Sequence, residues 1–567
     1  MATETKKQRY AKLVTSLKNE RSSFEPDWRE IGSFIKPRRI RLSRSETNRG
    51  GRRNQNIIDS TATQASTVLR AGMTTGMTSS ARPWFKFGTS DPALAKFGPV
   101  KNWLEDTRSI IASSLLKSNF YNCAPILYGD GGDFGTGAVG MFEDEKSVFR
   151  FTNFPLGEYY VANDHRGLVR VFIREFQLTV RQLVMQFGTM GPKGVADWSN
   201  FSTTIKTAWE RGDYEQWVDV CHVVQPNLEY NPNRLDAKYK PFTDCYFEVG
   251  REDGNDVFLR EKGFDEFPIM TARWEVAAGD VYGTDCPGLK VLGDVKQLQL
   301  GEKVSASAID KMVRPPIVAP TGARNAKLSQ LPGEISYIDE TQHATIRPLI
   351  DTSGFRVDLL EGKQQQIRDR VDEVYFKDLF RIMSNIDNPK DVTATFVNEL
   401  KEEKLLMLGP VFGQYDQDFM KPLIDRAFQM HYRAGELPEA PPELQGQDLE
   451  VEYISSMAIA LKAIGRGGMD VFTGYTLSLG AVIPEALDKF NADAAMDTYA
   501  DMTGVPPNVV NSDEQVAQIR KQRADMQRGQ MAIPAIAEGA NAAKTLSETP
   551  LNGNTALAAL MGAGGGQ

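Results

Sequence analysis

The chain has 567 residues, of which 41% are hydrophobic and 25% charged, and its formal net charge is -8 with a pI near 5.4. This composition is typical of a globular protein, and the length predicts two to four domains rather than one core. The acidic balance excludes a surface that coats itself with nucleic acid, although it allows weak contact with DNA.

The cysteines and the apolar stretches indicate the cellular compartment in which the protein is made. Cys123, Cys221, Cys245 and Cys286 are scattered along the chain. This spacing predicts neither a disulfide framework nor a zinc site, and it favours a reducing compartment. No stretch has the length of a signal peptide core or a membrane span, so we expect synthesis in a cytoplasm and no membrane partner.

A basic loop follows the first predicted helix, which covers residues 5–36. Seven arginines stand here against one acid, Glu46. The pattern is consistent with contact to DNA phosphates or to an acidic partner, and equally with a solvated loop that has no partner. The arginines are Arg38, Arg39, Arg41, Arg44, Arg49, Arg52 and Arg53.

Two helices are predicted next, over residues 59–87 and 100–119. The first is rich in small residues, which allow close packing, and it ends near Trp84, a candidate buried anchor. Residues 135–140 then read GTGAVG, formally a GxGxxG motif. A dinucleotide site needs a strand before this motif and a helix after it, whereas a helix or loop precedes it here and a strand follows. We therefore interpret it as a turn from helix to strand.

The remaining chain changes character several times. Alternating hydrophobicity predicts hairpin strands up to about residue 275, interrupted by a helix over 180–186, which together indicate an α+β fold. Residues 287–313 carry a helical apolar stripe and end at Arg314-Pro315-Pro316. A proline-bounded segment separates this helix from a second one, which ends at a short polar loop. A third long helix follows the loop, and the step Gly409-Pro410 predicts a kink in it.

Catalytic chemistry is not indicated by any motif. The four histidines have no spacing typical of zinc ligation or of nucleophilic catalysis, and His222 fits a core position in a strand. A phosphate-binding GxxxxGK[ST] loop is absent from the sequence, and the acidic clusters fit solvated faces. We predict a protein that is not an enzyme and has no cofactor and no metal.

Taken together, the segments resemble the portal proteins, the head-to-tail connectors of short-tailed bacteriophages. The resemblance runs from about residue 8 to 460 and rests on the order of several fragments. These are DSTATQASTVLRAGMTTGMTSSARPWFKF, FGTGAVGMFED, FPIMTARWEVAAGDVYGTDCPGLKVLGDVKQLQLGEKVSASAIDKMVRPP and DVTATFVNELKEEKLLMLGPVFGQYDQDFMKPLIDR.

The resemblance implies a phage portal fold assembled as a dodecameric ring around a DNA channel. Its parts map onto the chain as a wing (1–281), a stem helix (282–313), a clip (314–352), a second stem helix (353–384), a tunnel loop (385–390), a long kinked wing helix (391–450), a mostly helical crown (451–530) and a C-terminal tail of low order (531–567).

The implied function is passage of DNA through one capsid vertex during packaging and ejection. Expected partners are double-stranded DNA, the terminase, a tail adaptor and the major capsid or scaffolding protein. From the loop's position we predict that Asn385, Asp387, Asn388 and Lys390 face the DNA. Arg324 and Lys327 are candidates for docking a partner at the clip.

Two other classes stay open. One is a different virion structural protein, such as a tail adaptor or an internal core component. The other is an enzyme that uses the GxGxxG motif, and it predicts nucleotide binding.

Overall fold

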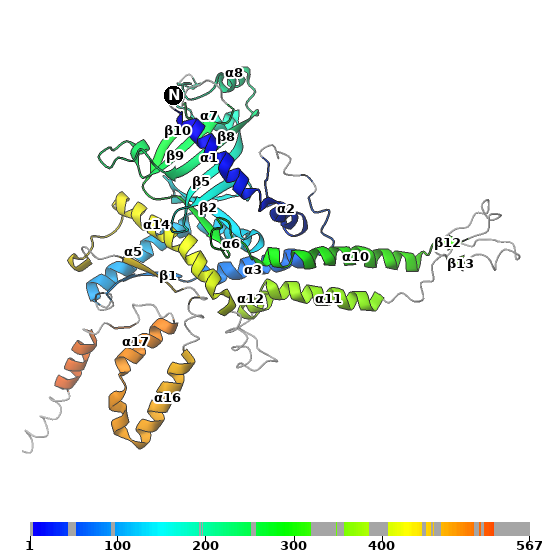
Figure 1. The fold of residues 1–567 in the computed structure, drawn as a ribbon. Coiled ribbons are helices and arrows are strands. Elements are labelled where there is room, and N and C mark those ends of the chain that lie inside the picture. The colour runs from blue at the N-terminus through cyan, green and yellow to red at the C-terminus, as the bar shows by residue number, and fades with distance from the viewer. Residues whose placement is uncertain are drawn as a thin grey trace, which may run out of the picture.

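The structure is a computed structural model, and Figure 1 shows a body of sheets and helices, a projecting helix pair and a small helical lobe. The residues that it describes are 4–43, 51, 53–91, 94, 97–191, 194–195, 197–250, 257–318, 347–348, 357–384, 406–444, 449–454, 458, 466–503, 510–511 and 515–526.

Helices begin the N-terminal half of the body, as far as the structure describes it. They are α1 (Lys6–Arg21), α2 (Glu25–Phe34), α3 (Thr61–Met77), α5 (Gly98–Lys117) and α6 (Phe120–Phe134). The single helix predicted over residues 5–36 is wrong, because a turn at residues 22–24 separates α1 from α2. Trp84 is buried as predicted, at 2% exposure. It lies beside a strand, β1 (Phe85–Thr89), rather than at the end of a helix.

A five-stranded antiparallel sheet has the order β10-β9-β8-β5-β4. Helix α1 packs on one face of it through Tyr10 and Leu17. Part of the other face carries a second apolar cluster built with α7 (Val180–Phe187) and α8 (Thr203–Arg211). The strands are β4 (Tyr159–Asn163), β5 (Val169–Thr179), β8 (Trp217–Pro226), β9 (Phe242–Glu248) and β10 (Arg260–Phe264).

A three-stranded antiparallel sheet, ordered β11-β2-β3, lies against α6 and holds the main core. Its strands are β2 (Thr136–Asp144), β3 (Val148–Phe154) and β11 (Ile269–Arg273). Strand β1 pairs with β14 (Leu449–Tyr453), more than 350 residues away in the chain, as in the pair Phe85 and Tyr453. Two short hairpin strands, β6 (Met190–Gly191) and β7 (Gly194–Val195), and a 3-10 turn, η1 (Ala237–Tyr239), complete this half. The α+β class predicted from the sequence is confirmed by these sheets and helices.

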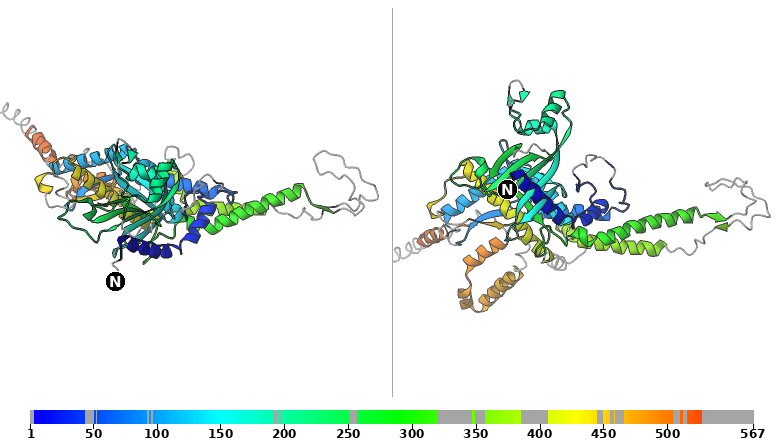
Figure 2. Two further views of the ribbon diagram at one scale, coloured as in Figure 1. Left: turned by 90° about the horizontal axis from the view of Figure 1, so that it is seen from above. Right: turned by 45° about the horizontal axis from the view of Figure 1, so that its top comes forward.

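The projecting pair consists of α10 (Leu292–Val313), entered through α9 (Pro287–Lys290), and α11 (Val357–Val374), which is followed by α12 (Lys377–Ser384). Figures 1 and 2 show the pair extending away from the body in every view. Just beyond its tip, β12 (Ile317–Val318) pairs with β13 (Arg347–Pro348), so the excursion between the two helices leaves and returns at the same place.

The C-terminal part begins with a helix over residues 406–415, which passes through Pro410. A π-helical turn, η4 (Asp416–Met420), follows, and then α14 (Lys421–Ala434). A short 3-10 turn, η5 (Pro442–Leu444), comes after α14. The lobe in orange in Figure 1 contains α16 (Arg466–Val482), η6 (Pro484–Lys489) and α17 (Ala492–Thr503). Strand β14 precedes this lobe in the chain.

Candidate functional site

The helix pair α10/α11 is antiparallel and is joined by polar contacts along its length. Gln364 Nε2 donates to Ser305 Oγ at 2.8 Å, and Arg368 forms an ion pair with Glu302. Closer to the body, Arg368 Nε donates to Asp59 at 3.0 Å, while Gln299 bonds the backbone of the segment before α3. The pair is therefore fixed to the body by polar side chains of both helices.

The base of the pair is organised around Asp133, near the end of α6. Its carboxylate accepts hydrogen bonds from Ser66 Oγ at 2.7 Å and from the Tyr375 hydroxyl, just after α11, at 3.0 Å. Its carbonyl oxygen accepts from Cys286 Sγ at 3.4 Å, just before α9. One residue thus contacts both helical arms, and burial raises the pKa of its carboxyl group to about 6.

Left-handed backbone marks both arms at this base. Asp285 has φ 56° before α9, and Phe376 has φ 55° between α11 and α12. This region is unfavourable for residues other than glycine, Asn and Asp, most of all for an aromatic residue such as Phe376. The surrounding packing must hold it, and Phe380, one turn later, fills the space over Gly72.

Exposure divides the pair into two halves, which we define by residues. The inner half (292–299 and 365–374) buries Leu292, Val295, Leu298, Ile367 and Val371. In the outer half (300–313 and 357–364), the described side chains that are buried are polar, Ser305 and Gln364. The outer half exposes large apolar side chains instead: Leu300, Val304, Ile309, Met312, Val313, Leu359 and Leu360.

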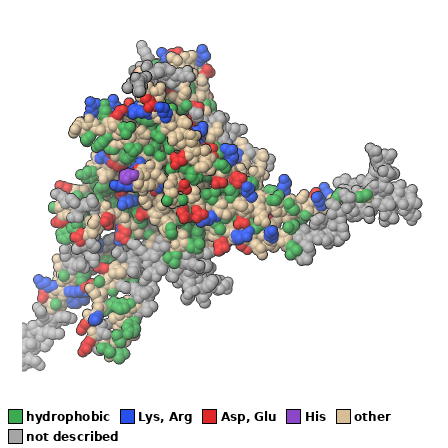
Figure 3. Space-filling model, in the orientation of Figure 1, with side chains coloured by type: hydrophobic (Ala, Val, Ile, Leu, Met, Phe, Trp, Pro, Cys, Tyr) green, Lys and Arg blue, Asp and Glu red, His purple; other side chains and the backbone are tan. Residues whose placement is uncertain are grey.

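The helical lobe shows a second apolar surface. Hydrophobic side chains gather on it in the space-filling view (Figure 3), and Phe472, Tyr475 and Leu477 of α16 are each more than half exposed. Exposed apolar side chains that gather on one surface mark a site at which another protein chain can bind.

The described arginines of the basic loop lie in different environments. Arg38 is exposed. Arg39 pairs with buried Asp130 through two hydrogen bonds, and Arg41 Nη1 lies 3.2 Å from Glu158. Arg53 is half-buried and also has an interaction partner. Arg39 and Arg41 thus form ion pairs within the chain. A contact of the basic loop with DNA or a partner protein stays a prediction.

Several predicted site residues lie outside the described residues. They are Arg44, Arg49 and Arg52 of the basic loop, Arg324 and Lys327 of the clip, and Asn385, Asp387, Asn388 and Lys390 of the tunnel loop. Their roles stay predictions.

The glycine motif is a helix-to-strand turn, as its flanking sequence predicted. Helix α6 ends at Phe134, Gly135 takes φ 83°, and Gly137 and Gly140 lie within β2. A side chain at Gly135 would meet the backbone oxygen of Gly283 at 2.3 Å. The glycines therefore serve close packing of backbone segments.

His222 is a core histidine, also as predicted. It is 1% exposed, its Nε2 lies 2.8 Å from Asp244, and its ring stacks on Tyr246. Burial lowers its pKa, and Asp244 opposes this effect.

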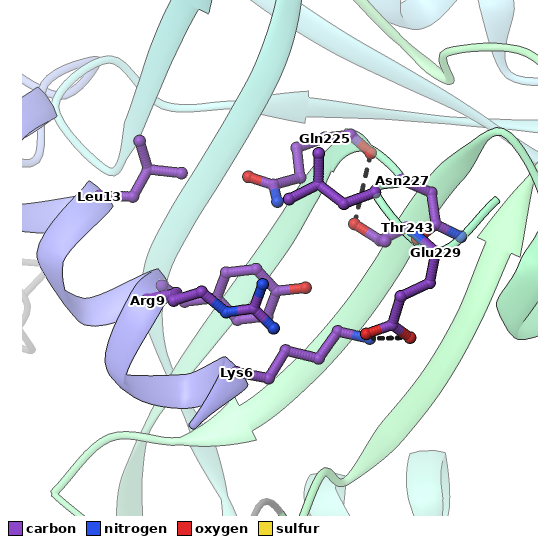
Figure 4. Close-up of a pocket in the computed structure, with 9 residues that line it drawn as sticks. Lys6, Arg9, Leu13, Gln225, Asn227, Glu229 and Thr243 are labelled. Carbon is purple, nitrogen blue, oxygen red and sulfur yellow. Dashed lines mark hydrogen bonds and ion pairs between the residues drawn. The ribbon is translucent and has the colours of Figure 1, made fainter. Parts of the chain in front are cut away.

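A small hollow of about 100 Å³ lies between α1 and the part of the five-stranded sheet where β8 ends and β9 begins (Figure 4). Lys6 crosses it to reach Glu229 at 3.3 Å and Glu261 at 2.6 Å. Both carboxylates neutralise the charge of Lys6. This side chain is therefore not available to bind a ligand in the hollow.

Among the described residues, no group of three His, Cys, Asp or Glu side chains has a geometry that could hold a metal ion. None of the described helices combines the length and hydropathy that a membrane span requires.

Comparison with known proteins decides the family. The model of the bacteriophage head-to-tail connecting protein family matches residues 7–510. The chain belongs to this family. It is 43% identical over 563 residues to the portal protein of Salmonella phage epsilon15, covering 99% of each chain. It is 37% identical over 562 residues to a probable portal protein of Bordetella phage BPP-1, covering 98% of each.

A solved structure of the virion of a native gene transfer agent particle has 12% sequence identity and covers 66% of this chain and 92% of that chain. Its TM-score of 0.24 is too low to argue from. Membership of the head-to-tail connecting family gives the chain the function of a portal protein, and its place is the portal vertex of the phage capsid.

Sequence reasoning missed the residues that fix the helix pair to the body. Asp133 stood in a glycine-rich stretch, and the two acidic side chains of this mostly apolar helix, Asp130 and Asp133, were the available signal. Arg368 carried no signal, because its partners Asp59 and Glu302 are distant in the sequence.

Proposed function

We propose that this portal protein forms a closed ring, a dodecamer by family resemblance, in which α10 and α11 of each subunit are the stem around a channel for double-stranded DNA. In this proposal residues 1–281 and 391–450 form the wing, 314–352 the clip, 385–390 the tunnel loop and 451–530 the crown. The clip docks the terminase during packaging and the tail adaptor afterwards, and the outer surface meets the capsid or scaffolding protein.

The exposed apolar surface of the outer half carries this proposal. Seven large apolar side chains there are more than a third exposed in the single chain. Burying a fully exposed side chain of this kind stabilises an assembly by about 1.5–3 kcal/mol, and each partly exposed one contributes a corresponding fraction. In a ring, the exposed apolar side chains of every subunit are covered in the same way, because each helix pair packs between two identical neighbours.

The channel needs no chemistry from this chain. DNA must move through it, so a lining that binds phosphates tightly would oppose transport. We therefore propose a passive pore, with ATP hydrolysed by another protein of the packaging machine. Asn385, Asn388 and Lys390 supply a few weak contacts at the constriction in this proposal.

Electron microscopy of the purified full-length chain tests the ring. We expect annular particles with a central hole, and sedimentation velocity should give one large species. Folded monomers only, or compact particles with no hole, would contradict the proposal and favour another virion structural protein such as a tail adaptor or core component.

The tunnel loop needs its own test, in an assembly extract that packages DNA. We expect Asn388→Ala and Lys390→Ala portals to form rings but to package or retain less DNA. Normal packaging and retention by both variants would remove the loop from the constriction and leave the ring proposal intact.

A further inference from the structure

A large cavity lies between the two sheets, away from the helix pair. Its volume is about 710 Å³, within the range of small-molecule sites. The floor is one face of the five-stranded sheet, with Arg174, Asp244 and Arg260 on it. The opposite wall comes from β2, β3 and α14, and Arg41 closes one side.

Basic side chains outnumber acidic ones in this lining. Seven lysines and arginines face four carboxylates. They are Arg41, Arg174, Lys240, Arg260, Lys262, Arg426 and Arg433, against Glu143, Glu158, Asp244 and Asp265. A surplus of positive charge in a recess between two layers is unfavourable unless anions compensate it.

The ion pairs show where the surplus lies. Glu158 serves two arginines, with Arg174 Nη2 at 2.6 Å and Arg41 Nη1 at 3.2 Å. Glu266, next to the lining residue Asp265, pairs with both Arg426 and Arg433, and Asp265 lies 2.8 Å from Lys240 Nζ and 3.9 Å from Arg433 Nε. Arg41 and Arg174 therefore retain one net positive charge beside Glu158, and Arg426, Arg433 and Lys240 together retain one beside Glu266 and Asp265.

Two further cations are incompletely satisfied. Arg260 donates from Nη2 to Asp244 at 3.0 Å, but its Nε is buried with no acceptor among the described residues. Lys262 is exposed at the rim, and no described acidic side chain forms an ion pair with it. An oxyanion in the cavity would give both side chains a charge-assisted hydrogen bond.

Aromatic rings hold these guanidinium groups in place. Arg174 lies over Phe176 at 3.9 Å and over Phe154 at 5.1 Å from the ring centres. Arg260 lies 4.6 Å over Tyr246, whose ring stacks on His222. Side chains fixed in this way lose little entropy when they bind a ligand.

We propose that this cavity binds a small multivalent oxyanion, carrying phosphate or carboxylate groups, which neutralises the surplus of arginine and lysine between the two sheets. The recess between sheets suits a small molecule better than duplex DNA, and the interspersed carboxylates disfavour a long polyanion. The ligand would bridge the five-stranded sheet and α14, and so stabilise the body of the subunit whether or not it forms a ring.

Isothermal titration of the full-length chain at constant ionic strength tests this site, with pyrophosphate in one arm and citrate in the other. The cavity variant is Lys262→Gln/Arg433→Gln, because Asp265 keeps Lys240 and Glu266 keeps Arg426. The control is Arg181→Gln/Lys206→Gln, which removes the same charge from the exposed faces of α7 and α8. Circular dichroism confirms that each variant is folded, and Lys262→Gln alone replaces the double variant if that does not fold.

We expect one saturable site per chain for at least one probe. Loss of charge-assisted hydrogen bonds should weaken binding about tenfold or more in the cavity variant and leave the control unchanged. Binding of pyrophosphate alone identifies a phosphate ligand, binding of citrate alone a carboxylate ligand, and binding of both the shared oxyanion chemistry. No binding of either probe at millimolar concentration, or equal weakening in both variants, overturns the proposal.

Discussion

The inner and outer halves of the helix pair have opposite patterns of burial. The inner half buries leucine, valine and isoleucine, whereas the outer half buries Ser305 and Gln364 and exposes its apolar side chains. Both halves belong to continuous helices with similar hydrophobic spacing. The inner stripe is therefore covered within the chain, while the outer stripe stays available for contact with another chain.

Charge placed on the outer stripe should have the largest effect, and it should act on assembly. In Val304→Glu/Ile309→Glu we expect rings to be lost, with sedimentation velocity showing monomers. The unfolding temperature of the subunit should change little, because both side chains are nearly half exposed. Leu235→Glu, at a fully exposed leucine in the body, is the control. Ring formation by the double variant would contradict the assignment of the outer half to a subunit interface.

A side chain added at the base should have the largest effect on stability. A β-carbon at Gly288 would lie 2.0 Å from the backbone oxygen of Asp133, which cannot move away cheaply. We expect Gly288→Ala to lower the free energy of unfolding by about 3 kcal/mol, measured by urea denaturation. Gly293→Ala in α10 is the matched control, because it meets nothing within 4 Å and should stabilise the helix by up to about 1 kcal/mol. Similar stability of the two variants would show that the base is loosely packed.

The pH dependence of stability should report on Asp133. Burial raises the pKa of its carboxyl group to about 6 in the folded chain, against an ordinary value of 3.8. The folded state therefore binds the proton more tightly, and stability falls as the pH rises from about 4 to 6. We expect Asp133→Asn, which is isosteric and uncharged, to be more stable than the wild type above pH 6 by about 3 kcal/mol and equal to it near pH 4.

Asp130→Asn provides the contrast for this experiment. Burial also raises the pKa of Asp130, but its carboxylate holds Arg39 through two hydrogen bonds. We expect this variant to be less stable than the wild type at neutral pH, because Arg39 loses its charged partner. An Asp133→Asn variant that is equally destabilised would show that the ionised form of Asp133 is needed at the base.

The smallest effects should separate two arginines on α11. Arg368 bridges Asp59 and Glu302 and is 28% exposed, whereas Arg370 pairs with Asp294 and is 57% exposed. We expect Arg368→Gln to lower the free energy of unfolding by about 1–3 kcal/mol and Arg370→Gln by less than about 1 kcal/mol, in urea denaturation. Equal effects would mean that the bridge to Asp59 does not fix the pair to the body.

Much of the local structure was predictable because it depends on neighbouring residues. The stripe through Leu292, Val295 and Leu298 predicted α10, and the alternation in β5 and β8 predicted strands. The glycine motif was interpreted correctly from its flanks alone. The family also followed from sequence, since the order of fragments extends over most of the chain.

Long-range pairing was not predictable in this way. Strand β14 pairs with β1, and a single short segment contains no information about a partner so far along the chain. Arg39 and Arg41 belonged to a basic run, yet they make ion pairs with Asp130 and Glu158, whose positions depend on the folded sheets and α6. The cavity between the sheets also had no sequence signature, because its lining comes from segments spread from Arg41 to Arg433.

For the helix pair itself, the sequence determined two amphipathic helices separated by a proline-bounded excursion. It could not determine which part of each stripe is covered, because Leu298 and Ile309 carry the same hydrophobic signal on one helix. Tertiary structure decided this, since the body reaches Leu298 and leaves Ile309 in solvent. The physical reason is that burial depends on what lies opposite a side chain in space, and the hydrophobic pattern of one helix does not encode that.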